Sequence, residues 1–104
     1  MLLSTSDEIA GKHIKKTIGI ARGSTIRARH LGRDFMAFFK MLVGGEIKTY
    51  TEMMAIAREE AIQRMIEAAE EMGANAIICV RFSSIMIMST TAECLAYGTA
   101  VILE

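Results

Sequence analysis

Long apolar runs, a recognisable secretory signal and an excess of charge of either sign are all missing from this 104-residue sequence. No uninterrupted apolar run nears the roughly 18 residues that span a bilayer, and the apolar segment Phe35–Phe39 ends at Lys40. The N-terminal residues have neither a basic start nor a long apolar stretch, as a secretory signal would. We therefore expect a cytoplasmic protein with no membrane partner.

The balance of charge also argues against nucleic acid as a partner. Twelve basic and twelve acidic side chains give a net charge of zero, whereas proteins that neutralise phosphates are basic. The charge is nevertheless uneven: residues 1–45 hold eight basic and three acidic side chains, and residues 46–104 hold four and nine. Two interpretations stay open, namely complementarity within one fold or head-to-tail pairing of subunits in a ring.

Cysteine is scarce, and its spacing excludes the common zinc motifs. Cys79 and Cys94 lie fifteen positions apart, and neither belongs to a CxxC pair. A closed zinc site takes four Cys or His ligands, and the only histidines are His13 and His30. We expect free thiols in a reducing compartment. Each cysteine is either a small core residue or a soft metal ligand, which a ring would repeat around its axis.

What the sequence has in abundance is apolar side chains, at 52 % of all residues. A chain of this length is one domain, here 1–104, and has little interior relative to its surface. The surplus therefore predicts burial between subunits of a homo-oligomer. Repeats, linkers and proline are absent.

One long helix is expected between Thr49 and Gly73. Thr49 and Glu52 fit a capping box, and Gly73 is a typical stop. Apolar residues recur between them at helical spacing. These are Tyr50, Met54, Ala57, Ala61, Met65, Ala68 and Met72.

The remaining apolar patterns predict strands in an α+β fold. We expect them at residues 1–5, 12–20, 25–29, 75–82 (extended through 85–88) and 93–103, with 21–24 as an interruption. On strand 75–82, Ala76, Ile78, Val80 and Phe82 should share one face, with Ile77 and Cys79 on the other. Since both faces are apolar, the long helix covers one, and a short helix or another subunit must cover the second.

Residues 34–43 predict that short helix. Asp34 can cap it and Gly44-Gly45 can end it, while its apolar residues occupy more than one side. We expect one side to pack on the sheet and the other to meet a neighbouring subunit, with Phe35, Phe39 and Val43 as candidate interface residues.

A basic run precedes this segment, consisting of Arg22, Arg27, Arg29, His30 and Arg33. Arg27, Arg29 and Arg33 are candidates for binding a small anion at a subunit junction; the alternatives are a solvated face or the positive half of a subunit contact. No glycine-rich phosphate loop accompanies them.

The order of several short motifs resembles the YbjQ-like family, uncharacterised bacterial and archaeal proteins labelled as heavy-metal-binding. The motifs are Gly44-Gly45, Tyr50, Ala57-Arg58 with Ala61, Gly73–Ile78 and Tyr97–Val101. The resemblance implies a dodecin-subunit-like fold, in which a small antiparallel sheet wraps a helix and subunits form a pentameric ring. It implies no catalytic residues.

Together these observations predict a non-catalytic, homo-oligomeric binding protein rather than an enzyme. The first candidate ligand is a soft heavy metal or selenium species at Cys79, with Cys94 as a second candidate thiol. The alternatives are a small anion held by the basic run, or a structural scaffold that binds a partner.

Overall fold

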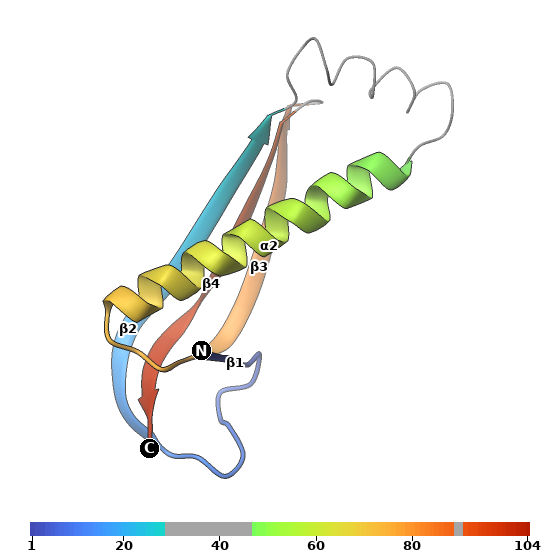
Figure 1. The fold of residues 1–104 in the computed structure, drawn as a ribbon. Helices are drawn as coiled ribbons and strands as arrows, with labels where there is room; N and C mark the ends of the chain where they lie inside the picture. Colours follow the sequence, from blue (N-terminus) through green and yellow to red (C-terminus); the bar gives the residue numbers. More distant parts are fainter. Residues whose placement is uncertain (29–46, 89–90) are drawn as a thin grey trace.

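The fold is α+β, as predicted, with a long helix lying across a curved sheet (Figure 1). The computed structural model describes residues 1–28, 47–88 and 91–104. Their elements are β1 (Leu2–Leu3), β2 (Ile14–Ala28), α2 (Ile47–Glu71), β3 (Ala76–Met88) and β4 (Thr91–Leu103). The short helix predicted at residues 34–43 lies outside the described residues.

The sheet has four strands in the order β1-β3-β4-β2. β4 lies in the centre and runs antiparallel to both β2 and β3. β1 pairs in parallel with the start of β3, Leu2 opposite Ala76 and Leu3 opposite Ile77. The three long strands are therefore antiparallel, as the resemblance implies, and the parallel pairing of the two-residue β1 makes the sheet mixed.

β2 is one continuous strand of 15 residues, so the interruption predicted at residues 21–24 was wrong. Gly23, which suggested a turn, instead lies where the backbone of α2 crosses the strand. A Cβ atom added there would collide with the Met65 amide nitrogen and the Ala61 carbonyl oxygen, and would lie 2.7 Å from the Arg64 carbonyl carbon. The Arg64 guanidinium also donates to the Ser24 carbonyl oxygen over 2.5 Å. Glycine at this position thus permits close contact between helix and strand.

The helix α2 begins at Ile47, two residues before the predicted cap Thr49, which therefore lies inside it. Its end agrees with the prediction, because Gly73 follows it with a φ of +85°. No described helix is long and apolar enough to cross a membrane.

Small side chains line the face of α2 that meets the sheet. The fully buried residues are Ala57, Ala61, Met65 and Ala69. The predicted stripe is confirmed at Ala57, Ala61 and Met65, but it continues to Ala69 rather than Ala68, and Met72 is 42 % exposed. Because these residues are four positions apart, their side chains form one row along the helix. This row meets the strands that α2 crosses.

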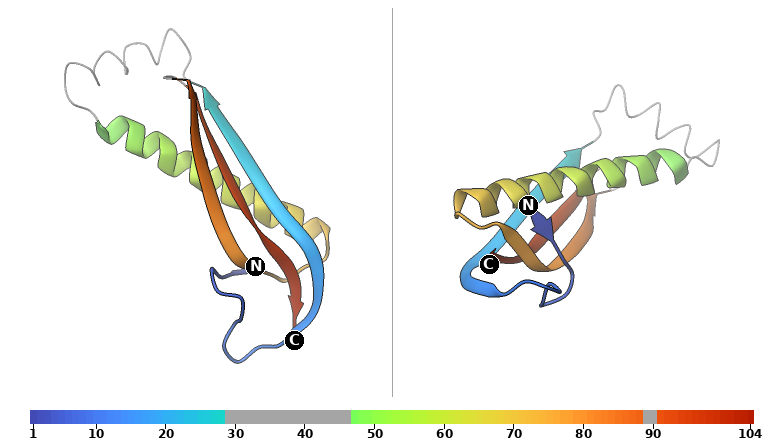
Figure 2. Two further views of the ribbon diagram at one scale, coloured as in Figure 1. Left: turned by 180° about the vertical axis from the view of Figure 1, so that it is seen from behind. Right: turned by 60° about the horizontal axis from the view of Figure 1, so that its bottom comes forward.

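A second, smaller cluster lies on the opposite face of the sheet. It joins Ala76, Ile78 and Val101, and Ile9 from the N-terminal segment packs against it. This segment covers only the lower end of that face. Seen from behind in Figure 2 (left), the rest of the face has no described element in front of it. We call this uncovered area the open face.

Candidate functional site

Cys79 lies in a β-bulge of β3. Ile78 is opposite Thr99, whereas Arg81 is opposite Tyr97, so β3 has one residue more than β4 between these pairs. Cys79 accommodates this extra residue with a φ of +54°. In bulges, this left-handed conformation is usually adopted by glycine. The bulge also reverses the alternation predicted for this strand.

Val80 shows this reversal directly. It packs in the cluster under α2 together with Ile77, and not with Ile78 as predicted. An extra residue moves every later side chain to the other face, and no periodicity in the sequence indicates where such a residue sits.

Residues 4–6 form hydrogen bonds with the bulge at the outer edge of β3. The Cys79 amide donates to the Ser6 carbonyl oxygen and the Val80 amide to the Ser4 carbonyl oxygen, each over 3.0 Å. The Arg81 guanidinium donates through Nη1 to the Thr5 carbonyl oxygen over 2.9 Å. The backbone around Cys79 is therefore bonded on the edge of β3 that β4 does not occupy.

The two thiols lie on opposite sides of the sheet. Cys79 is half-buried and packs with the smaller cluster, whereas Cys94 is fully buried under α2. The Ser84 hydroxyl donates to the Cys94 Sγ over 3.7 Å. Ser84 is also the residue opposite Cys94, five positions along β3 from Cys79. At about 3.3 Å per residue, the thiols are separated by about 16 Å along the strand, too far to share one metal ion bound at about 2.3 Å.

Histidine does not complete a site around either thiol in the described structure. His13 is exposed at the start of β2, where its carbonyl oxygen accepts from the Glu104 amide over 2.9 Å, and His30 lies outside the described residues. The described ranges hold no cluster of three or more His, Cys, Asp and Glu side chains that could bind a metal. The described part of one chain therefore offers a soft metal one accessible thiol, Cys79, and further thiol ligands must come from other copies or accompany the metal.

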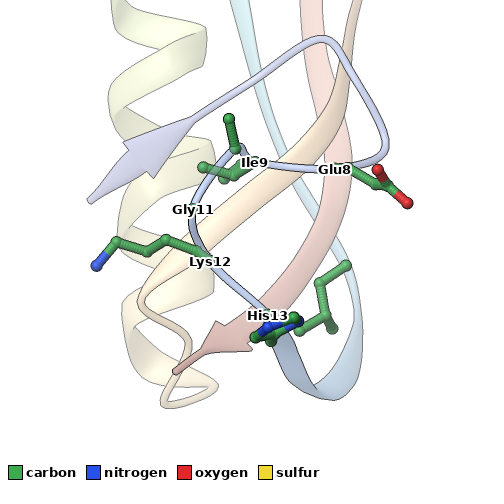
Figure 3. Close-up of a pocket in the computed structure, with 7 residues that line it drawn as sticks. Glu8, Ile9, Gly11, Lys12 and His13 are labelled. Atoms are coloured by element: carbon green, nitrogen blue, oxygen red, sulfur yellow. The ribbon is translucent and has the colours of Figure 1, made fainter.

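One hollow in the described surface is formed by a single loop. Its volume is about 630 Å³, and it is lined by the consecutive residues 8–14 (Figure 3). The charged ends of Glu8 and Lys12 point away from each other rather than into it. A ligand site normally brings polar groups together, so this hollow lacks the convergence that recognition requires.

The whole face of the sheet away from α2, of which the open face is the uncovered part, carries a regular pattern of side chains. Residues opposite one another in β2, β4 and β3 form rows across the sheet, and each row has the same residue type at both ends. The rows are Ile20-Thr99-Ile78, Arg22-Tyr97-Arg81, Ser24-Leu95-Ser83 and Ile26-Glu93-Ile85. Large apolar side chains remain uncovered here: Ile20 is 69 %, Ile26 is 62 % and Ile85 is 57 % exposed.

The predicted anion site and interface are left without a structural test. Arg27 pairs with Ala92 near the end of β2, and Arg29 and Arg33 lie outside the described residues. The candidate interface residues Phe35, Phe39 and Val43 also lie outside them.

Arg81 was missed as a candidate site residue. The signal was present, because residues 20–26 and 78–85 share an Ile, Arg, Ser, Ile order, although no repeat was expected. The extra residue Cys79 conceals it, since the spacing from Ile to Arg is two positions in β2 and three in β3.

Comparisons with known proteins agree on one group. A family model described as “YbjQ: Putative heavy-metal-binding” matches residues 1–104. A UPF0145 protein from Methanosarcina acetivorans is 56 % identical over 101 residues, covering 97 % of this chain and 95 % of that protein. A UPF0145 protein from Clostridioides difficile is 56 % identical over 104 residues, covering 100 % of this chain and 93 % of that protein.

A solved structure shows the same fold. It is a protein of unknown function from the DUF74 family of Pediococcus pentosaceus, with a TM-score of 0.70. It covers 100 % of this chain and 98 % of its own, but the sequences are only 15 % identical. At that identity the likeness concerns the fold and not the site.

Proposed function

Because the chain belongs to the YbjQ family of uncharacterised UPF0145 proteins, we propose that it is a non-catalytic, homo-oligomeric protein that binds a soft metal or selenium species through Cys79. The observation that carries this proposal is the half-buried thiol in a left-handed bulge. The description of the family as heavy-metal-binding supports it. Thiolates are the ligands that soft metals prefer.

The backbone at Cys79 supports a role for its side chain. A non-glycine residue in the left-handed region costs roughly 1–2 kcal/mol, and such residues persist where the surrounding structure holds them. The hydrogen bonds from residues 79 and 80 to the N-terminal segment provide that support. Glycine would remove this conformational cost, but it would also remove the thiol. A role of the thiol in metal binding would explain why cysteine occupies the position.

An oligomer supplies what one chain lacks. Since the described residues offer one accessible thiol per chain, a site with several soft ligands requires several copies, and we propose a pentameric ring. The uncovered Ile26 and Ile85, in the end row of the open face, favour such an assembly, because a second copy over that end would remove them from water. Among the described residues, β2 pairs only with β4, which leaves an edge available for another strand. Free thiols favour a reducing, cytoplasmic location.

Native mass spectrometry with elemental analysis of the same sample tests both parts. We expect a mass of five subunits, and metal or selenium at no more than one atom per thiol. Addition of Cd²⁺ to the metal-free protein should produce thiolate-to-cadmium absorption that Cys79→Ala abolishes. The matched variant Cys94→Ala should retain it, because Cys94 is fully buried under α2. Retention of cadmium by Cys79→Ala would refute the site, and an empty ring would favour a structural scaffold.

A further inference from the structure

We propose that the row Arg22-Tyr97-Arg81 on the open face is a binding site for a small oxyanion, such as a phosphate or carboxylate group. We call these three residues the arginine row. The site is distinct from Cys79 and requires neither a metal nor a second subunit. It shares Arg22 with the predicted basic run, but it joins Arg22 to Tyr97 and Arg81 from strands that are far apart in the sequence.

The sheet register places the two arginines on either side of one tyrosine. Tyr97 is opposite Arg22 in β2 and opposite Arg81 in β3. Adjacent strands lie about 4.8 Å apart, so the Cα atoms of the arginines are separated by about 10 Å. Two long side chains can close on a single anion across that distance, and Tyr97, which is 40 % exposed, lies beneath it.

Within the four rows, a single acidic side chain accompanies the two arginines. Arg22 is exposed and makes no side-chain hydrogen bond or ion pair with another described residue. The acidic residue in the four rows is Glu93, four positions from Tyr97 along β4, which is about 13 Å at 3.3 Å per residue. Two cations that flank one strand repel each other, and an oxyanion between them converts that repulsion into attraction.

Arg81 is oriented before any ligand arrives. Its Nη1 donates to the Thr5 and Val80 carbonyl oxygens, each over 2.9 Å. The Nε and Nη2 donors remain for a ligand, since these two bonds use only Nη1. The two bonds hold the guanidinium toward the edge of β3 that the N-terminal segment occupies, so the free Nε and Nη2 donors are the ones left to meet an anion on the open face.

The neighbouring groups suit a compact oxyanion. A guanidinium presents a planar fork of N–H donors that matches phosphate and carboxylate oxygens, often through two parallel hydrogen bonds. The phenol of Tyr97 can add a donor, and Ser24 and Ser83 supply hydroxyl groups in the next row. These donors all lie on one face, unlike the charged groups around the loop hollow.

Isothermal titration with inorganic phosphate and with succinate tests the site. We expect saturable binding of one anion per chain, and the better of the two probes identifies the class of oxyanion. Arg22→Gln should weaken binding about tenfold or more, because hydrogen bonds to charged groups contribute roughly 1.5–3 kcal/mol. Arg58→Gln on α2 removes the same charge from an exposed position elsewhere and should leave the affinity unchanged.

Tyr97→Phe separates recognition from simple charge attraction, since it removes the phenol donor without altering the charge, and we expect a measurable loss of affinity. The proposal fails if neither anion binds saturably, or if Arg58→Gln weakens binding as much as Arg22→Gln does. It also fails if Arg22→Gln changes the native mass and leaves anion binding intact, because the row would then contact a second copy of the chain.

Discussion

Replacing Gly23 with alanine should separate α2 from the sheet. The added Cβ would meet backbone atoms of Ala61, Arg64 and Met65, none of which can rotate away as a side chain could. The residues of α2 that pack here are fully buried, so the helix has no looser position that preserves its contacts. The substitution adds a single methyl group, yet it must displace a helix or bend a strand.

The size of the effect follows from the geometry. Carbon atoms pack best at about 3.5–4.0 Å, and the Arg64 carbonyl carbon would lie 2.7 Å from the new Cβ. The helix must therefore retreat by roughly 1 Å, a gap that forfeits about a quarter to a half of each dispersion contact. Overpacking commonly costs about 1–3 kcal/mol, and we expect about 3 kcal/mol because the obstacle is backbone.

Thermal unfolding at one fixed protein concentration measures this cost. A loss of about 3 kcal/mol should lower the Tm by roughly 12–24 °C, at about 4–8 °C per kcal/mol for a chain of about this size. Gly19→Ala is the matched control in the same strand, because no heavy atom lies within 4 Å of its added Cβ. We expect that control to be neutral or slightly stabilising. Equal Tm values for the two variants would refute the close approach of α2 to Gly23.

Three further substitutions test other features of the described structure. Cys79→Gly should leave the free energy of unfolding unchanged or raise it by up to about 1 kcal/mol, because glycine adopts a φ of +54° without strain. Deletion of Cys79 should instead unfold the protein, because the bulge is then lost; circular dichroism distinguishes the two variants. Thr25→Val should raise the free energy of unfolding, measured by urea denaturation, by about 1 kcal/mol, because the buried Thr25 Oγ1 has no partner among the described residues. A decrease would mean that the hydroxyl forms a hydrogen bond. Asn75→Ala should cost about 1–2 kcal/mol in the same assay, because the amide of Asn75 pairs with the Leu103 backbone over 3.0 and 2.7 Å; a neutral result would contradict these bonds.

The parts of the fold that depend on periodicity could be predicted from the sequence. The long helix, the N-terminal strand and the last two strands were all recognised, because their apolar residues recur with a regular spacing. The prediction of two separate strands in place of β2 was wrong because Gly23 was interpreted as a turn residue. In the structure, Gly23 allows the backbone of α2 to pack directly against β2. A glycine required by a distant backbone cannot be distinguished, in one sequence, from a glycine required by a local turn.

The candidate site was less predictable, for a reason that can be traced to one residue. Cys79 could be recognised as a thiol, but neither its left-handed conformation nor its hydrogen bond to Ser6 is encoded by local pattern. The side of the sheet on which Arg81 lies depends on that bulge. Pairing Arg81 with Arg22 also requires the order of the strands, which is a property of the whole fold.

The bulge at Cys79 therefore links the two proposed sites physically. It places Arg81 on the open face opposite Tyr97, and the segment that supports the bulge also accepts a hydrogen bond from Arg81 through Thr5. A species bound at Cys79 would act on the same short backbone that holds the guanidinium. If binding at Cys79 shifts residues 4–6, the affinity of the arginine row for anions must change, and thermodynamic linkage then requires that anions change the affinity for the metal by the same factor.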